Sequence, residues 1–483
     1  MKTKYIILLC LAGSSIFTGC KKDFLETSPS QFVSREDFAR ASEQDPSLLN
    51  GTVAGLYVTM YTTGTGGTTD HDDFGQKGYD IYMDMISSDM VLGATIYGWY
   101  STVARYQATT DYTRNEAYRP WRYYYRIILG ANIVLDAMGG DSTEQTEEVQ
   151  RHAAGQALAM RAYAYFYLSQ LYAKGYNASE KILPIYRNTV VPNQPKSTAQ
   201  EVYALMESDL RKAIDYLADF ERSSKDQIDQ SVAKGLLAYV LAARGSNADL
   251  TEAIALSNDI LGDFPLTSPA QATGGFNNVA TPSWMWGVDL TLASNLDLVS
   301  WWGQVDLFTY SYAWAGDPKL IDDGLYASIK DDDIRKTQFD DGWPINKFYA
   351  PARTVGGQRN ITSDYIYMRA DEFLLLKAES QARLGLDDEA RTTLKQLLDL
   401  RMDDYSYVDG LSGTALQDEI HLQTRIELWG EGKTYLAMKR THRGCTRGDN
   451  HLFEAGETFT WDAPELTFLI PQSEVLNNPN LNK

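Results

Sequence analysis

Apolar residues recur every three or four positions over much of the chain, which is the spacing of one face of an α-helix. Within residues 116–138 these positions are Trp121, Tyr124, Ile128, Ala131, Leu135 and Met138. Two consecutive glycines at 139–140 follow and give a helix stop signal. The pattern predicts a helix with a broad buried stripe.

Residues 148–172 predict a second helix, and alanine or glycine occupies many of its positions. Small side chains allow a neighbouring helix to approach closely. Ala162 followed four residues later by Phe166 also has the small-then-aromatic spacing of a tetratricopeptide hairpin. The two segments therefore predict a stacked helical hairpin.

Two later segments, residues 229–261 and 369–400, show the same pattern of two helices around a glycine. Further helices are expected near Arg35, around residues 81–86, and from Thr414 to Arg440. We therefore expect an all-α protein of tetratricopeptide-like hairpins arranged as an α–α superhelix.

One long segment departs from this pattern. Between residues 265 and 363 the alanine-rich helical runs disappear, and Pro, Gly, Asn, Asp and Trp become frequent. We interpret it as a loop-rich insertion within a single domain that spans residues 20–483.

The N-terminus has the pattern of an export signal, with Lys2 and Lys4 before a short apolar run. The following Ser-Ile-Phe-Thr-Gly-Cys is similar to a bacterial lipobox. We predict a signal peptide at residues 1–19 and lipidation of Cys20, which would hold the protein at a membrane surface. The alternative is a secreted protein in which Cys20 carries no lipid.

The charge of the chain limits its partners. The 483 residues include 44 Lys and Arg against 64 Asp and Glu, a formal net charge of −20. Without a concentrated basic patch, such a chain is a poor ligand for polyanions, so we expect no nucleic-acid partner.

Motifs for catalysis and metal binding are absent from the sequence. It contains no His-Glu-x-x-His, no Gly-x-Ser-x-Gly, no phosphate-binding glycine loop and no Cys-x-x-Cys pair. We therefore predict no enzyme activity, no catalytic residues, no metal and no cofactor. A structural calcium ion among the acidic loops and a glycosidase with two suitably spaced carboxylates remain open alternatives.

The distribution of aromatic residues along the chain indicates a binding function. Five of the ten tryptophans fall within residues 284–314, and another lies in the loop-like segment 93–100. Indole and phenol faces stack on sugar rings, while polar side chains bond to the hydroxyl groups. Our candidate glycan-binding residues are Trp99, Trp284, Trp301, Trp302, Tyr310 and Trp314. The alternative is that these rings pack in the core.

Several stretches, taken in order, resemble the SusD/RagB family of outer-membrane lipoproteins. They are Cys20-Lys-Lys-Asp-Phe-Leu-Glu26, residues 157–184, residues 366–401 ending in Arg401, Arg425-Ile-Glu-Leu-Trp-Gly-Glu-Gly432, and Ile470-Pro471 with Asn478-Pro479. The resemblance covers essentially the whole chain. It implies a helical fold, glycan binding at the cell surface, and a TonB-dependent outer-membrane transporter of the SusC type as partner.

We therefore expect a glycan-binding lipoprotein that is anchored in the outer membrane, faces the cell exterior and delivers oligosaccharides to such a transporter. Two alternatives stay open. One is a protein-docking subunit that binds peptide or glycoprotein cargo and whose aromatic residues form the core. The other is an anchored glycosidase.

Overall fold

The computed structural model describes residues 34–483. The expected signal peptide and the lipidation of Cys20 lie outside these residues, so both stay predictions. Among the helices of residues 34–483, none has both the length and the apolar character needed to cross a bilayer.

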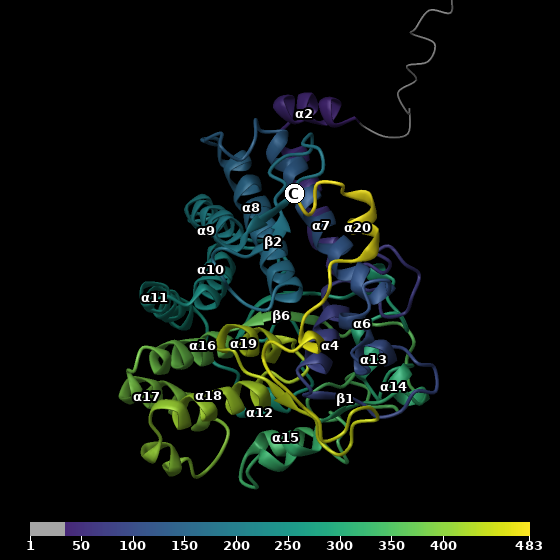
Figure 1. Ribbon diagram of the computed structural model, residues 1–483, viewed down its shortest axis with the longest axis vertical. Helices are drawn as coiled ribbons and strands as arrows, with labels where there is room; N and C mark the ends of the chain where they lie inside the picture. Colours follow the sequence, from purple (N-terminus) through teal and green to yellow (C-terminus); the bar gives the residue numbers. More distant parts are fainter. Residues whose placement is uncertain (1–33) are drawn as a thin grey trace, which may run out of the picture.

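A row of long helices forms one side of the molecule (Figure 1). Its members are α7 (Asn115–Asp136), α8 (Glu148–Tyr172), α9 (Ala199–Tyr216), α10 (Gln230–Arg244), α11 (Asn247–Asp263), α16 (Ala370–Arg383), α17 (Asp387–Leu398) and α18 (Gly413–Glu427). Each of the helices from α7 to α17 packs on the next, and α18 packs on both α16 and α17. The predicted all-α fold of stacked helical pairs is confirmed.

Small residues explain the close packing in this row. Helix α8 is buried on all sides from Ala153 to Tyr172, because α7 and α9 both pack against it. At Gly155 an added Cβ would lie 2.8 Å from Leu217, so the neighbouring chain leaves no room for a side chain. Capping boxes at Thr198 and Ser246 begin α9 and α11.

The predicted single helix from Thr414 to Arg440 is wrong, because the structure has two helices there. Helix α18 ends at Glu427, and α19 (Lys433–Thr441) begins after five intervening residues. Gly430 and Gly432 between them have φ angles of +81° and +71°, a left-handed conformation that ends an α-helix. Helix α9 is not among the helices predicted from the sequence.

Shorter elements surround the row. They are α2 (Arg35–Gln44), α3 (Ser47–Thr59), α4 (Gln76–Ile86), β1 (Met90–Leu92), α5 (Ser101–Ala104), α6 (Gln107–Thr110), β2 (Lys181–Pro184), β3 (Lys196–Thr198), β7 (Cys445–Thr446), β8 (Thr458–Phe459) and α20 (Gln472–Asn477). The strands of the described chain form antiparallel pairs: β1 with β5 (Lys319–Ile321), β2 with β3, β4 (Trp284–Val288) with β6 (Tyr365–Arg369), and β7 with β8.

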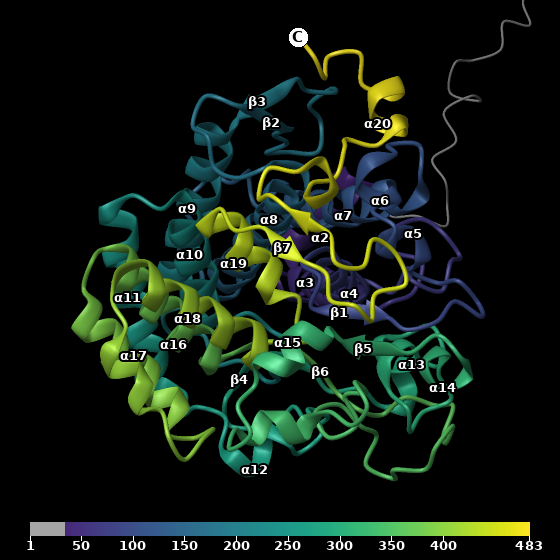
Figure 2. The same ribbon diagram turned by 60° about the horizontal axis from the view of Figure 1, so that its bottom comes forward.

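The segment between α11 and α16 leaves the helical row and returns to it, since those two helices pack on each other. It contains α12 (Pro269–Ala272), β4 (Trp284–Val288), α13 (Trp301–Val305), α14 (Tyr312–Ala315), β5 (Lys319–Ile321), α15 (Asp323–Ser328) and β6 (Tyr365–Arg369). Figure 2 shows these short elements in the lower half of the picture, with α13 and α14 near β5.

A buried network of ion pairs joins this segment to the helical row. At the end of α18, Glu427 receives hydrogen bonds from Arg369 and Arg401 at 2.9 Å and from Arg335 at 3.2 Å. Arg369 also pairs with Glu431 at 2.9 Å, and Lys347 pairs with Glu431 at 3.2 Å. Arg335 and Lys347 belong to the insertion, so the two glutamates hold it against the helices.

The charges of this network support one another. All of these side chains are buried, so each would be costly without a partner. Burial alone would raise the pKa of Glu427, but the guanidinium groups of Arg401 and Arg369 hold that pKa well below its ordinary value. Each arginine also has a second buried carboxylate partner, Asp333 for Arg335 and Asp371 for Arg369 and Arg401, so Glu427 is the anion that all three share.

Glu427→Gln removes this charge and nearly keeps the shape of the side chain. We expect the free energy of unfolding to fall by about 3–5 kcal/mol, because three guanidinium groups lose a buried partner. Urea denaturation followed by circular dichroism measures the change. Glu252→Ala breaks the exposed pair with Arg211 and should cost less than about 1 kcal/mol. Equal losses in the two variants would show that the network adds nothing.

Candidate functional site

Three of the six predicted glycan-binding residues lie in the core. Trp284, Trp301 and Trp302 are 1%, 2% and 1% exposed. The ring of Trp301 packs against Phe348 with centroids 4.5 Å apart, and Trp284 belongs to β4 in a two-stranded sheet. These three side chains present no ring face to solvent and cannot stack on a ligand. That part of the prediction is corrected.

The other three predicted residues come together on the surface, and β-strand pairing explains why. In the antiparallel pair of β1 and β5, Leu92 lies opposite Lys319. The chain that follows Leu92 and the chain that precedes Lys319 therefore leave the sheet at the same end. This places loop 93–100, with Trp99, beside residues 306–316, with Tyr310 and Trp314.

We call the resulting surface the aromatic patch and define it by Tyr97, Trp99, Tyr310, Tyr312 and Trp314. Tyr97, Tyr310 and Trp314 are 57%, 38% and 44% exposed. The rings of Tyr310 and Trp314 lie 5.5 Å apart, and Tyr97 meets Tyr312 at 5.2 Å. The two segments touch through the buried Tyr312, and the exposed rings of Tyr310 and Trp314 lie two residues to either side of it in the sequence.

A second layer supports these rings from below. Trp99 is half-buried and stacks on the imidazole of His71, with centroids 5.0 Å apart and an interplanar angle of 9°. The buried Tyr312 hydrogen-bonds to Nδ1 of His71 and meets Trp99 edge-on at 6.2 Å. The orientation of Trp99 is therefore set by two neighbouring rings.

Buried polar groups hold loop 93–100 in place. The carboxylate of Asp317 accepts hydrogen bonds from the backbone N–H groups of Tyr97 at 3.0 Å and Gly98 at 2.9 Å. Gln304 donates to the carbonyl of His71 at 2.8 Å and accepts from Lys319 at 2.9 Å. Burial lowers the pKa of Lys319 to about 7.

Asp306 holds the loop that carries Tyr310 and Trp314 in place, as Asp317 holds loop 93–100. Its carboxylate accepts from the N–H groups of Phe308 and Ala350, both at 3.0 Å, and from the hydroxyl of Thr309. It thereby joins this loop to residues 350–359. Burial raises the pKa of Asp306 to about 6, although these donors act in the opposite direction.

Residues 350–359 add polar groups at the edge of the patch. The guanidinium of Arg359 lies over the ring of Tyr310 at 5.3 Å. Gly356 has a φ of +60°, and a Cβ there would lie 2.4 Å from the indole of Trp314. Only glycine lets the backbone approach that ring, so Gly356 sets the position of Trp314.

No group of three or more His, Cys, Asp or Glu residues within 34–483 is arranged to hold a metal ion. The thiol of Cys445 is buried, and burial raises its pKa. The absence of a metal or cofactor stays a prediction.

Sequence reasoning missed three members of this site. Tyr97 lies two residues before Trp99 in the same glycine-bounded loop, so the same composition argument would have found it. His71 and Tyr312 have no signal of their own. His71 lies outside both aromatic segments of the sequence. Tyr312 differs from the exposed Tyr310 and Trp314 only in that its ring is buried.

Two family models match separate parts of the chain. Residues 58–241 match the SusD-like model described as starch-binding associating with outer membrane. Residues 321–483 match the model of the SusD family. The chain belongs to the SusD/RagB family. The two matches include most of the helical row, while residues 242–320, which carry Tyr310 and Trp314, lie outside both.

Solved structures of this family share the fold. A SusD-like carbohydrate binding protein from Bacteroides vulgatus is 23% identical, with a TM-score of 0.76, and the match covers 90% of this chain and 96% of that one. A SusD superfamily protein from Bacteroides fragilis is 23% identical, with a TM-score of 0.71 and coverages of 91% and 99%. Surface glycan-binding protein A from Bacteroides uniformis is 20% identical, with a TM-score of 0.63 and coverages of 90% and 98%. Among curated proteins, none matches this sequence.

The raised pKa of Asp306 predicts a pH dependence of stability. A carboxyl with a pKa of about 6 in the folded chain, against an ordinary 3.8, binds its proton more tightly when folded. Its contribution to folding is therefore complete below about pH 4 and is lost as the pH rises through 6. Asp306→Asn does not titrate and serves as the reference.

We expect the stability of the parent chain relative to Asp306→Asn to decline between about pH 4 and 6.5 and then to stay constant. Urea denaturation at half-unit steps of pH measures this difference. A difference that does not change over this range would contradict the assignment.

Proposed function

We propose that this SusD-family protein is a non-enzymatic glycan-binding lipoprotein of the outer-membrane surface. It captures oligosaccharides on the aromatic patch and delivers them to a TonB-dependent transporter of the SusC type. The observation that carries the proposal is the aromatic patch, a set of exposed rings that buried carboxylates hold in place. Family membership and solved neighbours whose titles name carbohydrate or glycan binding support it.

The patch offers both kinds of contact that a sugar requires. The faces of Trp314, Tyr310 and Tyr97 provide apolar surface for the C–H groups of a pyranose ring. The hydroxyl groups of the tyrosines and the guanidinium of Arg359 at its edge can hydrogen-bond to the hydroxyl rim. Because hydrated hydroxyl groups must lose water on binding, we expect modest affinity for each sugar unit.

The carboxylates at the patch support binding without hydrolysis. A glycosidase needs two carboxyl groups that face the scissile bond. Asp306 and Asp317 are both fully buried, and both accept hydrogen bonds from the backbone of the loops they hold. Because both carboxylates hold the protein backbone, the exposed rings are the groups that contact the ligand.

Delivery to a transporter is the part of the proposal that rests on family membership. The concave stack of α7–α11 and α16–α18 is the type of surface that helical-repeat proteins present to protein partners. A lipid on Cys20 would hold the chain beside an outer-membrane channel.

The double variant Tyr310→Ala/Trp314→Ala tests the patch. We expect a loss of about tenfold or more in affinity, because two stacking faces are worth about 1.5 kcal/mol or more together. Isothermal titration calorimetry with an oligosaccharide selected on a glycan array measures it.

Two control variants accompany this test. Tyr112→Ala removes a similarly exposed ring, 39% exposed, elsewhere on the surface and should leave affinity unchanged. Trp301→Ala removes a core ring and should lower stability by about 3–5 kcal/mol. Full affinity in the double variant on an intact fold would remove the patch from the proposed function.

A further inference from the structure

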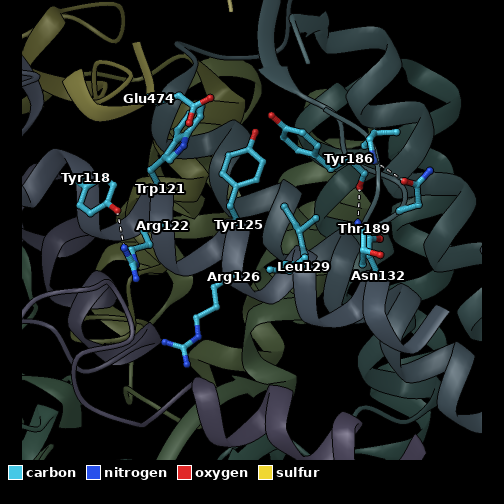
Figure 3. A pocket seen from close by; sticks show the side chains of 13 residues that line it. Tyr118, Trp121, Arg122, Tyr125, Arg126, Leu129, Asn132, Tyr186, Thr189 and Glu474 are labelled. Atoms are coloured by element: carbon cyan, nitrogen blue, oxygen red, sulfur yellow. Dashed lines mark hydrogen bonds between the residues drawn. The ribbon is translucent and has the colours of Figure 1, made fainter. Parts of the chain in front are cut away.

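A groove lies along the exposed face of α7. It has a volume of about 560 Å³ and is closed on one side by the loop around Tyr186 and on another by Glu474 of α20. Positions 118, 122, 125, 126 and 129 of α7 lie on one face of this helix, since they repeat at three- and four-residue intervals. We call this the α7 groove (Figure 3).

Its floor is a continuous aromatic surface. The rings of Trp121 and Tyr125 lie 4.8 Å apart, and Tyr125 meets Tyr186 at 5.8 Å with the planes at 84°. The hydroxyl of Tyr125 donates to the carbonyl of Pro184 at 2.9 Å, and that of Tyr186 accepts from the N–H of Gln194 at 3.3 Å. These two hydrogen bonds hold the rings of Tyr125 and Tyr186 in place.

Two arginines distinguish the α7 groove from the aromatic patch. The exposed Arg122 and Arg126 lie one turn apart and, within residues 34–483, neither has a carboxylate within 4.0 Å. Arg122 donates to the hydroxyl of Tyr118 at 2.9 Å, a neutral partner. In Figure 3 both guanidinium groups lie on one side of Tyr125, and Tyr186 lies on the other.

The charge of the whole protein makes this pair notable. The chain carries a net charge of −20, and most of its arginines are paired with carboxylates, as Arg151, Arg161 and Arg211 are. The carboxylate that lines the α7 groove, Glu474, accepts a hydrogen bond from Asn478 of its own helix region at 2.9 Å. Glu474 keeps its charge, but within residues 34–483 neither guanidinium forms an ion pair with it, so the two positive charges of the groove outnumber its one negative charge and remain available for an anion.

We propose that the α7 groove is a second glycan site, and that it binds an acidic oligosaccharide whose carboxylate or sulfate groups pair with Arg122 and Arg126. The inference rests on the proposed function for the class of ligand. A guanidinium forms two parallel hydrogen bonds to a carboxylate or sulfate, while the rings of Tyr125 and Tyr186 provide apolar surface for the sugar. A neutral glycan would leave both charges unpaired, so the groove selects for acidic sugars.

Calorimetry on the mature protein with three probes tests this site. Trigalacturonate supplies carboxylates, a chondroitin 4-sulfate tetrasaccharide supplies sulfates as well, and methyl-esterified trigalacturonate has the same rings without charge. We expect at least one acidic probe to bind and to weaken as salt rises from 50 to 300 mM, and the ester to bind at least tenfold more weakly.

Arg122→Ala/Arg126→Ala should reduce the affinity for the acidic probe at least tenfold. The control variant Arg211→Ala/Arg443→Ala removes the same charge elsewhere and should have no such effect. Tyr310→Ala/Trp314→Ala should leave binding of the acidic probe unchanged, which separates this site from the aromatic patch.

Three results would overturn the inference. They are no binding of either acidic probe, unchanged affinity in Arg122→Ala/Arg126→Ala, and loss of acidic binding in the aromatic-patch variant. A polyglutamate peptide that binds through Arg122 and Arg126 when neither saccharide does would assign the groove to acidic peptides instead. In each case, binding of neutral glycans at the aromatic patch would still uphold the proposed function.

Discussion

The charge of Glu427 is the constraint on which the arrangement of this protein depends. Three arginines from different parts of the chain meet at this one buried carboxylate: Arg335 in the insertion, Arg369 at the end of β6 and Arg401 after α17. Removing its charge would leave each guanidinium with one buried anion fewer, which is costly in the core. Because Lys347 also reaches Glu431 from the insertion, the ion pairs determine where nearly a hundred loop-rich residues sit against the helices.

The protein thus divides its tasks between two kinds of structure. The stacked helices bury their small and apolar faces against one another. The insertion and loop 93–100 carry the rings that reach solvent, and buried carboxylates hold them by their backbone. Asp306 and Asp317 lie directly below the aromatic patch, so loops without long helices or sheets can still present Trp314 and Tyr97 in set orientations.

The sequence predicted the helices well because their apolar spacing and small residues determine local structure. It failed where tertiary packing decides. Gly430 and Gly432 split a periodic segment, and the direction of a tryptophan cannot be read from its neighbours, so Trp301 and Trp302 were assigned to a surface although they form core. Among the residues that carried the family resemblance, Arg401, Glu427 and Glu431 are members of the buried ion-pair network.

The two proposed sites differ in whether their arginines have carboxylate partners. In a chain with 20 more negative than positive charges, a guanidinium without a carboxylate partner attracts an anion from outside. At the aromatic patch, Arg359 pairs with Asp297 at 3.3 Å, so its charge is balanced and the rings dominate. In the α7 groove Arg122 and Arg126 have no such partner, and charge dominates. Both surfaces combine tyrosine rings with arginine. The aromatic patch therefore favours neutral sugars, and the α7 groove favours acidic sugars.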